Sequence, residues 1–179
     1  MRLAIVADTY PPLRTSGAVQ LRDLAREFTA QGHEVTMIVA SPEISSRHHV
    51  DTSGAVTVLR LKVPRTKDIG YVRRAINEFL APFIMRRNMR LSALARARFD
   101  GVIWYSPTIF LGPLVKSLKR EQRCPAYLIV RDIFPQWAAD MGLMSRGTAY
   151  QLLSRVARFQ YSVADIIGVQ TPGNLPFLR

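Results

Sequence analysis

The chain has 179 residues, 48% of them apolar and 21% charged, which is the length and composition of one globular domain and excludes a disordered chain. The formal net charge of +12 predicts attraction to phosphate-rich partners, namely nucleic acid, nucleotide-linked substrates or an anionic lipid surface. A single cysteine, Cys124, excludes an internal disulfide, and no apolar run approaches the roughly 18–20 residues needed to span a bilayer. The sequence opens without a signal-peptide pattern, so we expect a cytoplasmic protein.

The first forty residues follow a strand–helix–strand pattern. Residues 3–7 form an unbroken apolar run, which is typical of a strand buried on both faces. Residues 18–31 place apolar side chains at helical spacing, and Gly32 is a candidate C-cap for that helix. A second buried strand is predicted over residues 35–40. The unit has about the length that a crossover between parallel strands requires.

The same alternation continues along the chain. Further strands are predicted over residues 56–61, 102–104, 126–130 and 166–169, and further helices over 70–96, 109–119 and 148–162, the first of them interrupted by Pro82. The polar segment 45–49 is expected to be a mobile loop, and Cys124 is expected to be buried. Six strands that alternate with helices predict an α/β fold, with a Rossmann-like, mostly parallel sheet and helices on both faces.

The loop after the first strand is where such folds bind phosphate groups, because N–H groups of the next helix converge there. This loop contains one glycine, Gly17, so the glycine pattern of a dinucleotide site is absent, and the chain has no P-loop sequence. A single glycine before a helix is more often only a tight turn. We assign no catalytic role to the histidines His33, His48 and His49.

Two segments resemble the family 4 glycosyltransferases of the GT-B type. One is the opening of the chain, where a strand, a proline-containing loop and a helix lead to a glycine–histidine turn: residues 3–12, Ser16, Gly17, Gly32 and His33. The other is more specific and runs from Arg131 to Gly142: it includes Asp132, Ile133, Phe134 and Pro135. This stretch is similar to one in the subgroup that builds O-antigen and capsule-type polysaccharides and acts on N-acetylated aminosugars. The resemblance extends over the whole chain.

The resemblance implies an enzyme of two Rossmann-like domains with the active site between them. The N-terminal domain holds the acceptor, and the C-terminal domain holds the sugar nucleotide. Residues 1–179 are then a single acceptor-side domain, truncated before the donor-binding domain and inactive alone. Residues 171–179 are expected to be a loop that leads into a further helix, with a short terminal tail as the alternative. The family retains anomeric configuration and needs no metal or other cofactor, because the nucleotide-sugar donor is a substrate.

The same resemblance implies roles for five residues. Ser16 and Gly17 map onto the loop that approaches the donor diphosphate. Tyr10, Arg131 and Asp132 are expected to line the cleft that holds the acceptor. Asp132 is also the candidate catalytic residue, although an N-cap or a partner for Arg131 is nearly as good an interpretation. No metal ligands are expected.

The segment that begins at Gly70 carries apolar residues at steps of three and four, flanked by arginines. Aromatic and basic residues of this kind are typical of a helix that lies on a membrane surface. The residues proposed for the membrane contact are Arg73, Arg74, Phe79, Phe83, Arg86, Arg87 and Arg90. A core-packing helix with solvated arginines is the alternative. The implied acceptor is a saccharide linked to a lipid diphosphate, which places the protein on the inner face of the cytoplasmic membrane.

Two other functions compete with this interpretation. Nucleic-acid binding would need aromatic and basic residues interleaved on a sheet surface, or a recognition helix, and the sequence indicates neither. A non-enzymatic basic α/β module that binds a membrane or a protein partner would explain the charge equally well. The family resemblance favours a glycosyltransferase domain for bacterial surface polysaccharide.

Overall fold

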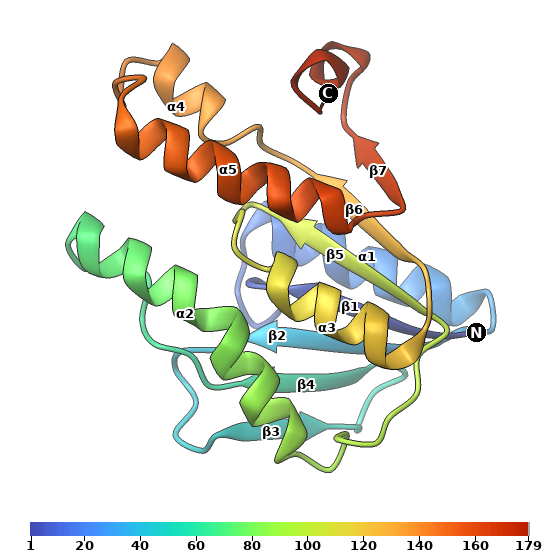
Figure 1. Ribbon diagram of the computed structural model, residues 1–179. Helices are drawn as coiled ribbons and strands as arrows, with labels where there is room; N and C mark the ends of the chain where they lie inside the picture. The colour runs from blue at the N-terminus through green and yellow to red at the C-terminus, as the bar shows by residue number, and fades with distance from the viewer. Residues whose placement is uncertain (179) are drawn as a thin grey trace.

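The computed structural model describes residues 1–178 and has one seven-stranded sheet (Figure 1). The strands are β1 (Arg2–Ala7), β2 (Glu34–Ala40), β3 (His48–Asp51), β4 (Thr57–Leu61), β5 (Gly101–Ser106), β6 (Ala126–Val130) and β7 (Ile166–Val169). Their order in the sheet is β3-β4-β2-β1-β5-β6-β7. Only β3 pairs antiparallel, on β4, and the other pairs are parallel.

Helices cover both faces of this sheet, as the sequence predicts. On one face lies α1 (Ser16–Ala30), and on the other lie α2 (Tyr71–Arg90), α3 (Gly112–Gln122) and α5 (Thr148–Val163) (Figure 1). A short helix, α4 (Gln136–Asp140), precedes α5, and a 3-10 helix, η1 (Pro172–Leu178), follows β7. No helix within the described residues is long and apolar enough to cross a bilayer.

Side chains of the central strands alternate between two hydrophobic cores. In β1, Ala4 and Val6 belong to the core under α2 and α3, whereas Ile5 and Ala7 belong to the core under α1. Every residue of β5 is buried, because this strand lies inside the sheet with helices on both sides. The predicted burial of Cys124 is confirmed.

Several sequence predictions were wrong in detail. The segment 45–49, expected to be a mobile loop, overlaps the start of β3, an edge strand whose residues alternate between half-buried and exposed. It raises the number of strands from six to seven. The second helix was expected over 70–96 with a break at Pro82, but α2 is continuous through that residue and ends at Arg90. The short helix α4 was not predicted, and the last residues form η1, not a loop before a helix.

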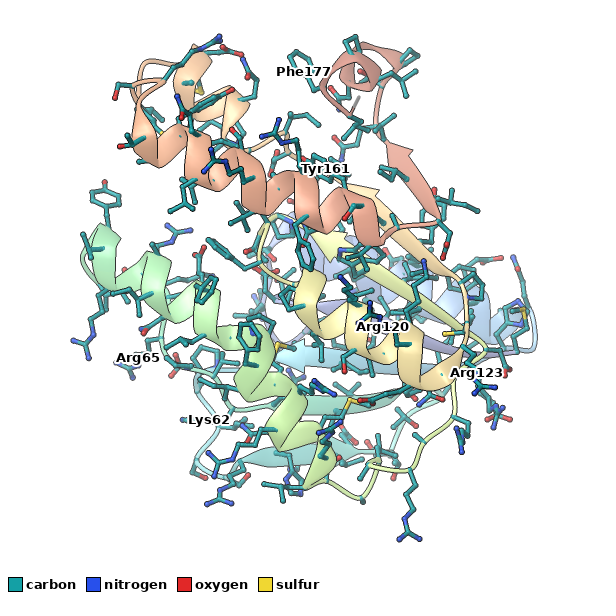
Figure 2. All side chains as sticks on the ribbon, viewed as in Figure 1. Lys62, Arg65, Arg120, Arg123, Tyr161 and Phe177 are labelled. Carbon is teal, nitrogen blue, oxygen red and sulfur yellow. The ribbon has the colours of Figure 1, made fainter. Side chains whose placement is uncertain are left out.

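Polar side chains of β4 and the residue after it fix the loops at the carboxyl edge of the sheet. Arg60 donates to the carbonyl oxygen of Pro11 in the loop after β1. Lys62, labelled in Figure 2, donates to the carbonyl oxygens of Pro42 and Ile44 in the loop after β2. Charge-assisted bonds of this kind hold otherwise irregular backbone in place next to the edge where ligands bind in such sheets.

Candidate functional site

The strand order reverses between β1 and β5, because the chain extends from β1 towards β3 and then returns to place β5 on the other side. In open parallel sheets ligands bind outside the carboxyl ends of the strands at such a switch point. The loop after β1, the start of α1 and the residues after β5 and β6 all meet at this edge. It is therefore the candidate site.

The first turn of α1 is held close to the end of β5. Thr15 is the N-cap, and its Oγ1 accepts from the backbone N–H of Ala18 at 3.2 Å. Its Oγ1 also lies 2.9 Å from the Oγ1 of Thr9, in the loop after β1. A Cβ atom on Gly17 would lie 3.1 Å from the ring and hydroxyl of Tyr105. A side chain at position 17 would therefore be tight against Tyr105, and α1 begins at the edge of the sheet.

Arg131 connects three elements at this edge. It follows β6, and its guanidinium donates to the hydroxyl of Tyr105 at 2.7 Å and to Oγ of Ser16 at 3.0 Å. The bond to Tyr105 raises the pKa of Arg131 above its ordinary value, so the residue is a permanent cation. The structure therefore brings together three of the predicted site residues, Ser16, Gly17 and Arg131, from positions more than one hundred residues apart.

Asp8, which the sequence pattern does not single out, provides a carboxylate at this edge. It follows β1 directly and continues the alternation of Ala4 and Val6, on the face covered by α2. Its side chain reaches solvent, but the surrounding protein desolvates it and raises its pKa from 3.8 to about 6. Glu78 of α2 raises the pKa further, whereas Lys67 and Arg74 lower it.

The loop after β5 is fixed by a buried amide. Gln160 of α5 is fully buried, and its Nε2 donates to Oγ of Ser106 at 2.7 Å and to the carbonyl oxygen of Thr108 at 3.0 Å. A Cβ atom on Gly112, at the start of α3, would lie 3.1 Å from Cα of Gln160. The contact of α3 with α5 therefore sets the position of this third loop of the site.

The other predicted cleft residues are placed differently. Tyr10 is 7% exposed and lies in the core under α1, so its side chain does not open onto the edge, and its role in acceptor binding stays a prediction. Asp132 is exposed beside Arg131, and the two partners of that arginine are Tyr105 and Ser16. Within residues 1–178, no three His, Cys, Asp or Glu side chains lie close enough to hold a metal ion.

The segment after Arg131 folds as a short loop and α4. Trp137 of α4 packs against Phe134 with ring centroids 6.1 Å apart, and Gln136 accepts from the hydroxyl of Tyr150 at the start of α5. Trp137 and Met141 nevertheless remain exposed. The most family-specific stretch of the sequence thus forms an apolar projection beside the site.

Helix α2 carries two different stripes along its length. On one stripe, Ala81, Met85 and Met89 pack into the core. The other stripe is exposed and changes character halfway along the helix. Its members, at steps of three and four residues, are Val72, Ile76, Phe79 and Phe83, followed by Arg86, Arg87 and Arg90. The predicted apolar face of this helix is therefore turned towards solvent.

Two of the predicted membrane arginines contact α3. Arg86 and Arg90 both donate to Oε1 of Glu121, at 2.8 and 2.7 Å. Burial alone would raise the pKa of Glu121, but these bonds and one from Ser117 lower it. Arg74 pairs with Glu78 at 2.7 Å on the stripe that faces Asp8.

Comparisons with known proteins identify the family of the chain. The family model described as "Glycosyl transferase 4-like domain" matches residues 16–173. A protein of Escherichia coli, provisionally named as the colanic acid biosynthesis glycosyl transferase WcaI, is 23% identical over 171 residues. The match covers 90% of this chain and 42% of that protein, so the chain spans less than half of the relative's length.

Solved structures share the fold. The sucrose-phosphate synthase of Thermosynechococcus elongatus aligns with a TM-score of 0.72 and 12% identity, over 99% of this chain and 44% of that one. A UDP-forming α,α-trehalose-phosphate synthase from Burkholderia xenovorans, in complex with glucose-6-phosphate, aligns with a TM-score of 0.66 and 16% identity, over 98% and 41%. Both are GT-B glycosyltransferases, which confirms the predicted fold class. The chain belongs to the glycosyl transferase 4-like domain family and has the fold of the N-terminal domain of a GT-B glycosyltransferase.

Proposed function

We propose that this chain is the acceptor-binding domain of a retaining glycosyltransferase in bacterial surface polysaccharide biosynthesis. The enzyme transfers a sugar, hexosyl or N-acetylated aminosugar, from a nucleotide-sugar donor to an acceptor linked to a lipid diphosphate. Donor binding belongs to a second domain outside residues 1–179, so this segment alone is inactive. The reaction requires no metal or other cofactor. The observation that carries the proposal is the site at the switch point, where Ser16, Gly17 and Arg131 lie within the family match of residues 16–173.

The donor diphosphate approaches the start of α1. Arg131 of the acceptor cleft contacts Ser16 at 3.0 Å, so its fixed positive charge lies between the donor diphosphate and the acceptor and attracts the phosphates of both. The close packing of Gly17 on Tyr105 brings backbone N–H groups to the same edge. Guanidinium and helix N–H groups together favour a doubly charged diphosphate over a neutral group.

The acceptor sugar lies on the α2 side of the same edge. Asp8 and, after β6, Asp132 provide carboxylates that accept hydrogen bonds from sugar hydroxyls. Asp8 is the stronger candidate because its environment raises its pKa to about 6, so that it can also take up a proton near neutral pH. Asp132 remains the second candidate for direct contact with the reacting sugar.

The lipid part of the acceptor determines where the protein works. The exposed apolar half of α2, Trp137 of α4 and the following residue Met141 lie on segments that leave the sheet at the same edge as the site. On α2 this apolar surface continues into Arg86, Arg87 and Arg90. A bilayer with anionic headgroups matches that sequence of apolar and basic groups. We place the protein on the inner face of the cytoplasmic membrane.

The acceptor site is tested by titrating this chain with a water-soluble, short-chain prenyl-diphosphate sugar and following backbone amide signals by NMR. We expect shifts at Asp8, Gly17 and Ser106, and at least tenfold weaker binding by Arg131→Gln, because one charged hydrogen bond contributes about 1.5–3 kcal/mol. Arg26→Gln, an equal charge change on the exposed side of α1, is the control. Shifts confined to other parts of the chain, or an equal loss in the control, would contradict the proposal.

The membrane contact is tested separately by flotation with phosphatidylglycerol vesicles. Ile76→Ser combined with Phe83→Ser should abolish flotation, since each side chain buries apolar area in the interface. The matched control is Leu152→Ser, which removes a similarly exposed apolar side chain from α5. Unchanged flotation of the α2 double variant would exclude this surface.

A further inference from the structure

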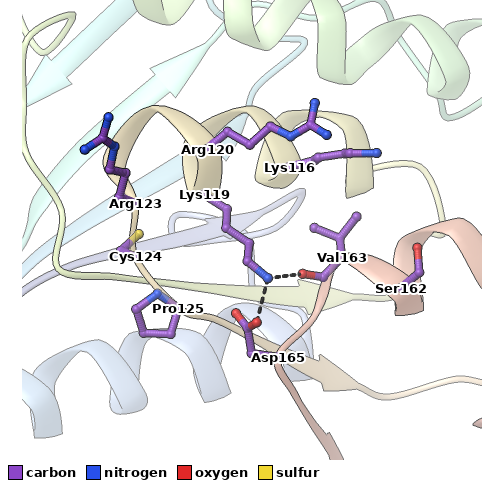
Figure 3. A pocket seen from close by; sticks show the side chains of 9 residues that line it. All are labelled: Lys116, Lys119, Arg120, Arg123, Cys124, Pro125, Ser162, Val163 and Asp165. Atoms are coloured by element: carbon purple, nitrogen blue, oxygen red, sulfur yellow. Dashed lines mark hydrogen bonds and ion pairs between the residues drawn. The ribbon is translucent and has the colours of Figure 1, made fainter.

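A recess lies at the edge of the sheet opposite the switch-point site, between the ends of α3 and α5 (Figure 3). Its volume is about 590 Å³. The residues that line it are Lys116, Lys119, Arg120, Arg123, Cys124, Pro125, Ser162, Val163 and Asp165. Cys124 and Pro125 precede β6 and Asp165 precedes β7, so this recess is at the amino ends of strands whose carboxyl ends carry the site described above. It serves no step of the proposed transfer.

The basic side chains of the recess outnumber the acidic groups that pair with them. Lys119 donates to Oδ1 of Asp165 at 2.7 Å and to the carbonyl oxygen of Val163, so the single acid of the recess is already paired (Figure 3). Lys116 lies over the ring of Phe159 at 4.9 Å. Arg120 and Arg123 form no ion pair within residues 1–178.

Helix dipoles account for only part of this excess. The carboxyl ends of α3 and α5 meet at the recess, and each carries about half a negative charge. Two helix ends therefore offset about one positive charge. Four basic side chains against one carboxylate leave an excess of three, so about two remain. The nearest further acid on α3, Glu121, is bound by Arg86 and Arg90 of α2.

The backbone at Arg123 also departs from the usual helix end. Arg123 is the C-cap of α3 and has φ of 53°, in the left-handed region that favours glycine. An arginine at this position places a long cation at the rim of the recess where glycine would relieve the backbone. Figure 3 shows Arg120 extending along α3 on the same side as Lys116, whereas Arg123 points away at the other end of the rim.

The surroundings extend the positive surface. Of the helices on this face of the sheet, α2 has five arginines and one acid, α3 three basic residues and one acid, and α5 two arginines and no acid. On the other face, α1 has two arginines and two acids. An anion that approaches the recess is therefore attracted by the whole α2–α3–α5 face.

We propose that this recess is an anion site that binds a phosphate group, held by Arg120 and Lys116, with Arg123 adding positive charge at the other end of the rim. Guanidinium groups hydrogen-bond two phosphate oxygens at once, and an ammonium adds a third donor. The phosphate belongs either to an anionic lipid headgroup or to a small soluble ligand. This inference does not depend on glycosyl transfer, because no residue of the recess belongs to the switch-point site.

The test uses the variant Arg120→Gln combined with Arg123→Gly, and inorganic phosphate as the first probe. Phosphate should shift the amide signals of residues around 120–125 and 162–165 in the original protein. In the variant we expect about thirtyfold weaker binding, since each basic residue near an anionic group contributes roughly a fivefold factor. Glycine removes the left-handed strain at position 123, so the variant should unfold at no lower urea concentration than the original protein.

The control is Arg22→Gln combined with Arg26→Gln, which removes the same charge from α1. Loss of phosphate binding in the recess variant alone supports the site. Equal loss in both variants, or shifts spread evenly over the α2–α3–α5 face, would overturn it, because the effect would then come from net charge.

Vesicles identify the source of the phosphate. If the recess variant also loses binding to phosphatidylglycerol vesicles but keeps its weak binding to phosphatidylcholine, the ligand is a lipid headgroup. If it binds both vesicles like the original protein while inorganic phosphate binding is lost, the ligand is a soluble phosphate compound. Both results support the site. Failure of the short-chain prenyl-diphosphate sugar to bind at the other edge would leave this inference unaffected.

Discussion

The two stripes of α2 differ in their surroundings: one packs against the sheet and the other is exposed to solvent. On the inner stripe, Arg74 and Glu78 face Asp8 at the edge of the sheet, and Met85 and Met89 then enter the core. On the outer stripe the order is reversed, with apolar residues first and arginines after them. The second half of the helix is therefore fixed by packing, whereas the first half projects from the sheet with its apolar side chains exposed. Packing at one end of the helix positions an exposed surface at the other.

The largest predicted loss of stability comes from a substitution in the buried part of the inner stripe. Met85→Ala should lower the free energy of unfolding by about 2–5 kcal/mol, because Met85 is fully buried and the cavity cannot refill. Ile76→Ala on the outer stripe should change it by no more than about 0.5 kcal/mol. Urea denaturation of both variants measures the difference. Similar losses at the two positions would mean that the outer stripe is packed as well.

The first turn of α1 is tightly packed against the sheet, whereas the first half of α2 is exposed. Gly17→Val should lower the free energy of unfolding by about 1–3 kcal/mol, because even a Cβ atom would lie 3.1 Å from Tyr105 and 3.3 Å from Thr9. Gly54→Val, at a position with open space, is the matched control. If both valine variants are equally stable under urea, the contact between α1 and β5 is looser than described.

The pH dependence of stability tests the environment of Asp8, which faces the charged part of the inner stripe. The pKa of Asp8 is about 6 in the folded protein and near 3.8 in the unfolded chain, so between these pH values the folded state binds a proton that the unfolded state does not. Stability contributed by this group therefore decreases as pH rises from 3.8 through 6. Asp8→Asn should remove that decrease and gain about 1 kcal/mol at pH 7, a value reduced because the side chain reaches solvent.

Urea unfolding of both proteins across this pH range measures the effect. Carbon NMR of the carboxyl group would locate the titration directly. The groups that face Asp8 are Glu78 and Arg74 of α2 and Lys67 of the preceding loop. Parallel stability curves for the two proteins would show that Asp8 is an ordinary surface carboxylate.

The smallest effect concerns the junction between the basic half of α2 and α3. Glu121→Gln removes the partner of Arg86 and Arg90, and should cost no more than about 1 kcal/mol because the pairs are half-exposed. The two arginines then become available to anionic lipid, so flotation with phosphatidylglycerol vesicles should increase. Weaker flotation of this variant would mean that the ion pairs hold the arginines in the geometry that lipid binding needs.

Much of the fold could be predicted from the sequence, because buried parallel strands are short apolar runs and the helices between them keep their spacing. The strand β3 could not, since its residues are polar and only half-buried at an edge. The spacing of apolar residues in α2 predicts an apolar stripe, but it does not show which side of the helix packs against the sheet. Both stripes have steps of three and four, and the buried one is made of small or flexible residues such as Ala81 and Met85.

Part of the arrangement at this edge of the sheet could also be predicted, although the roles of its residues stay predictions. Ser16, Gly17 and Arg131 carry the family pattern and are brought together. Tyr105 and Asp8 were missed, because Tyr105 is placed by its contacts with Gly17 and Arg131 and the pKa of Asp8 depends on its surroundings, including Glu78, far away in the sequence. The available signal was position, since both lie at or just beyond the carboxyl ends of the two strands at the switch point.

The most direct test of an acceptor domain at a membrane is flotation of this chain with phosphatidylglycerol vesicles that contain or lack a polyprenyl-diphosphate saccharide. The account predicts tighter binding with the saccharide, and loss of that increase, but not of vesicle binding itself, in Arg131→Gln. Binding that is indifferent to the saccharide would contradict the acceptor role and leave a basic module that docks on membranes.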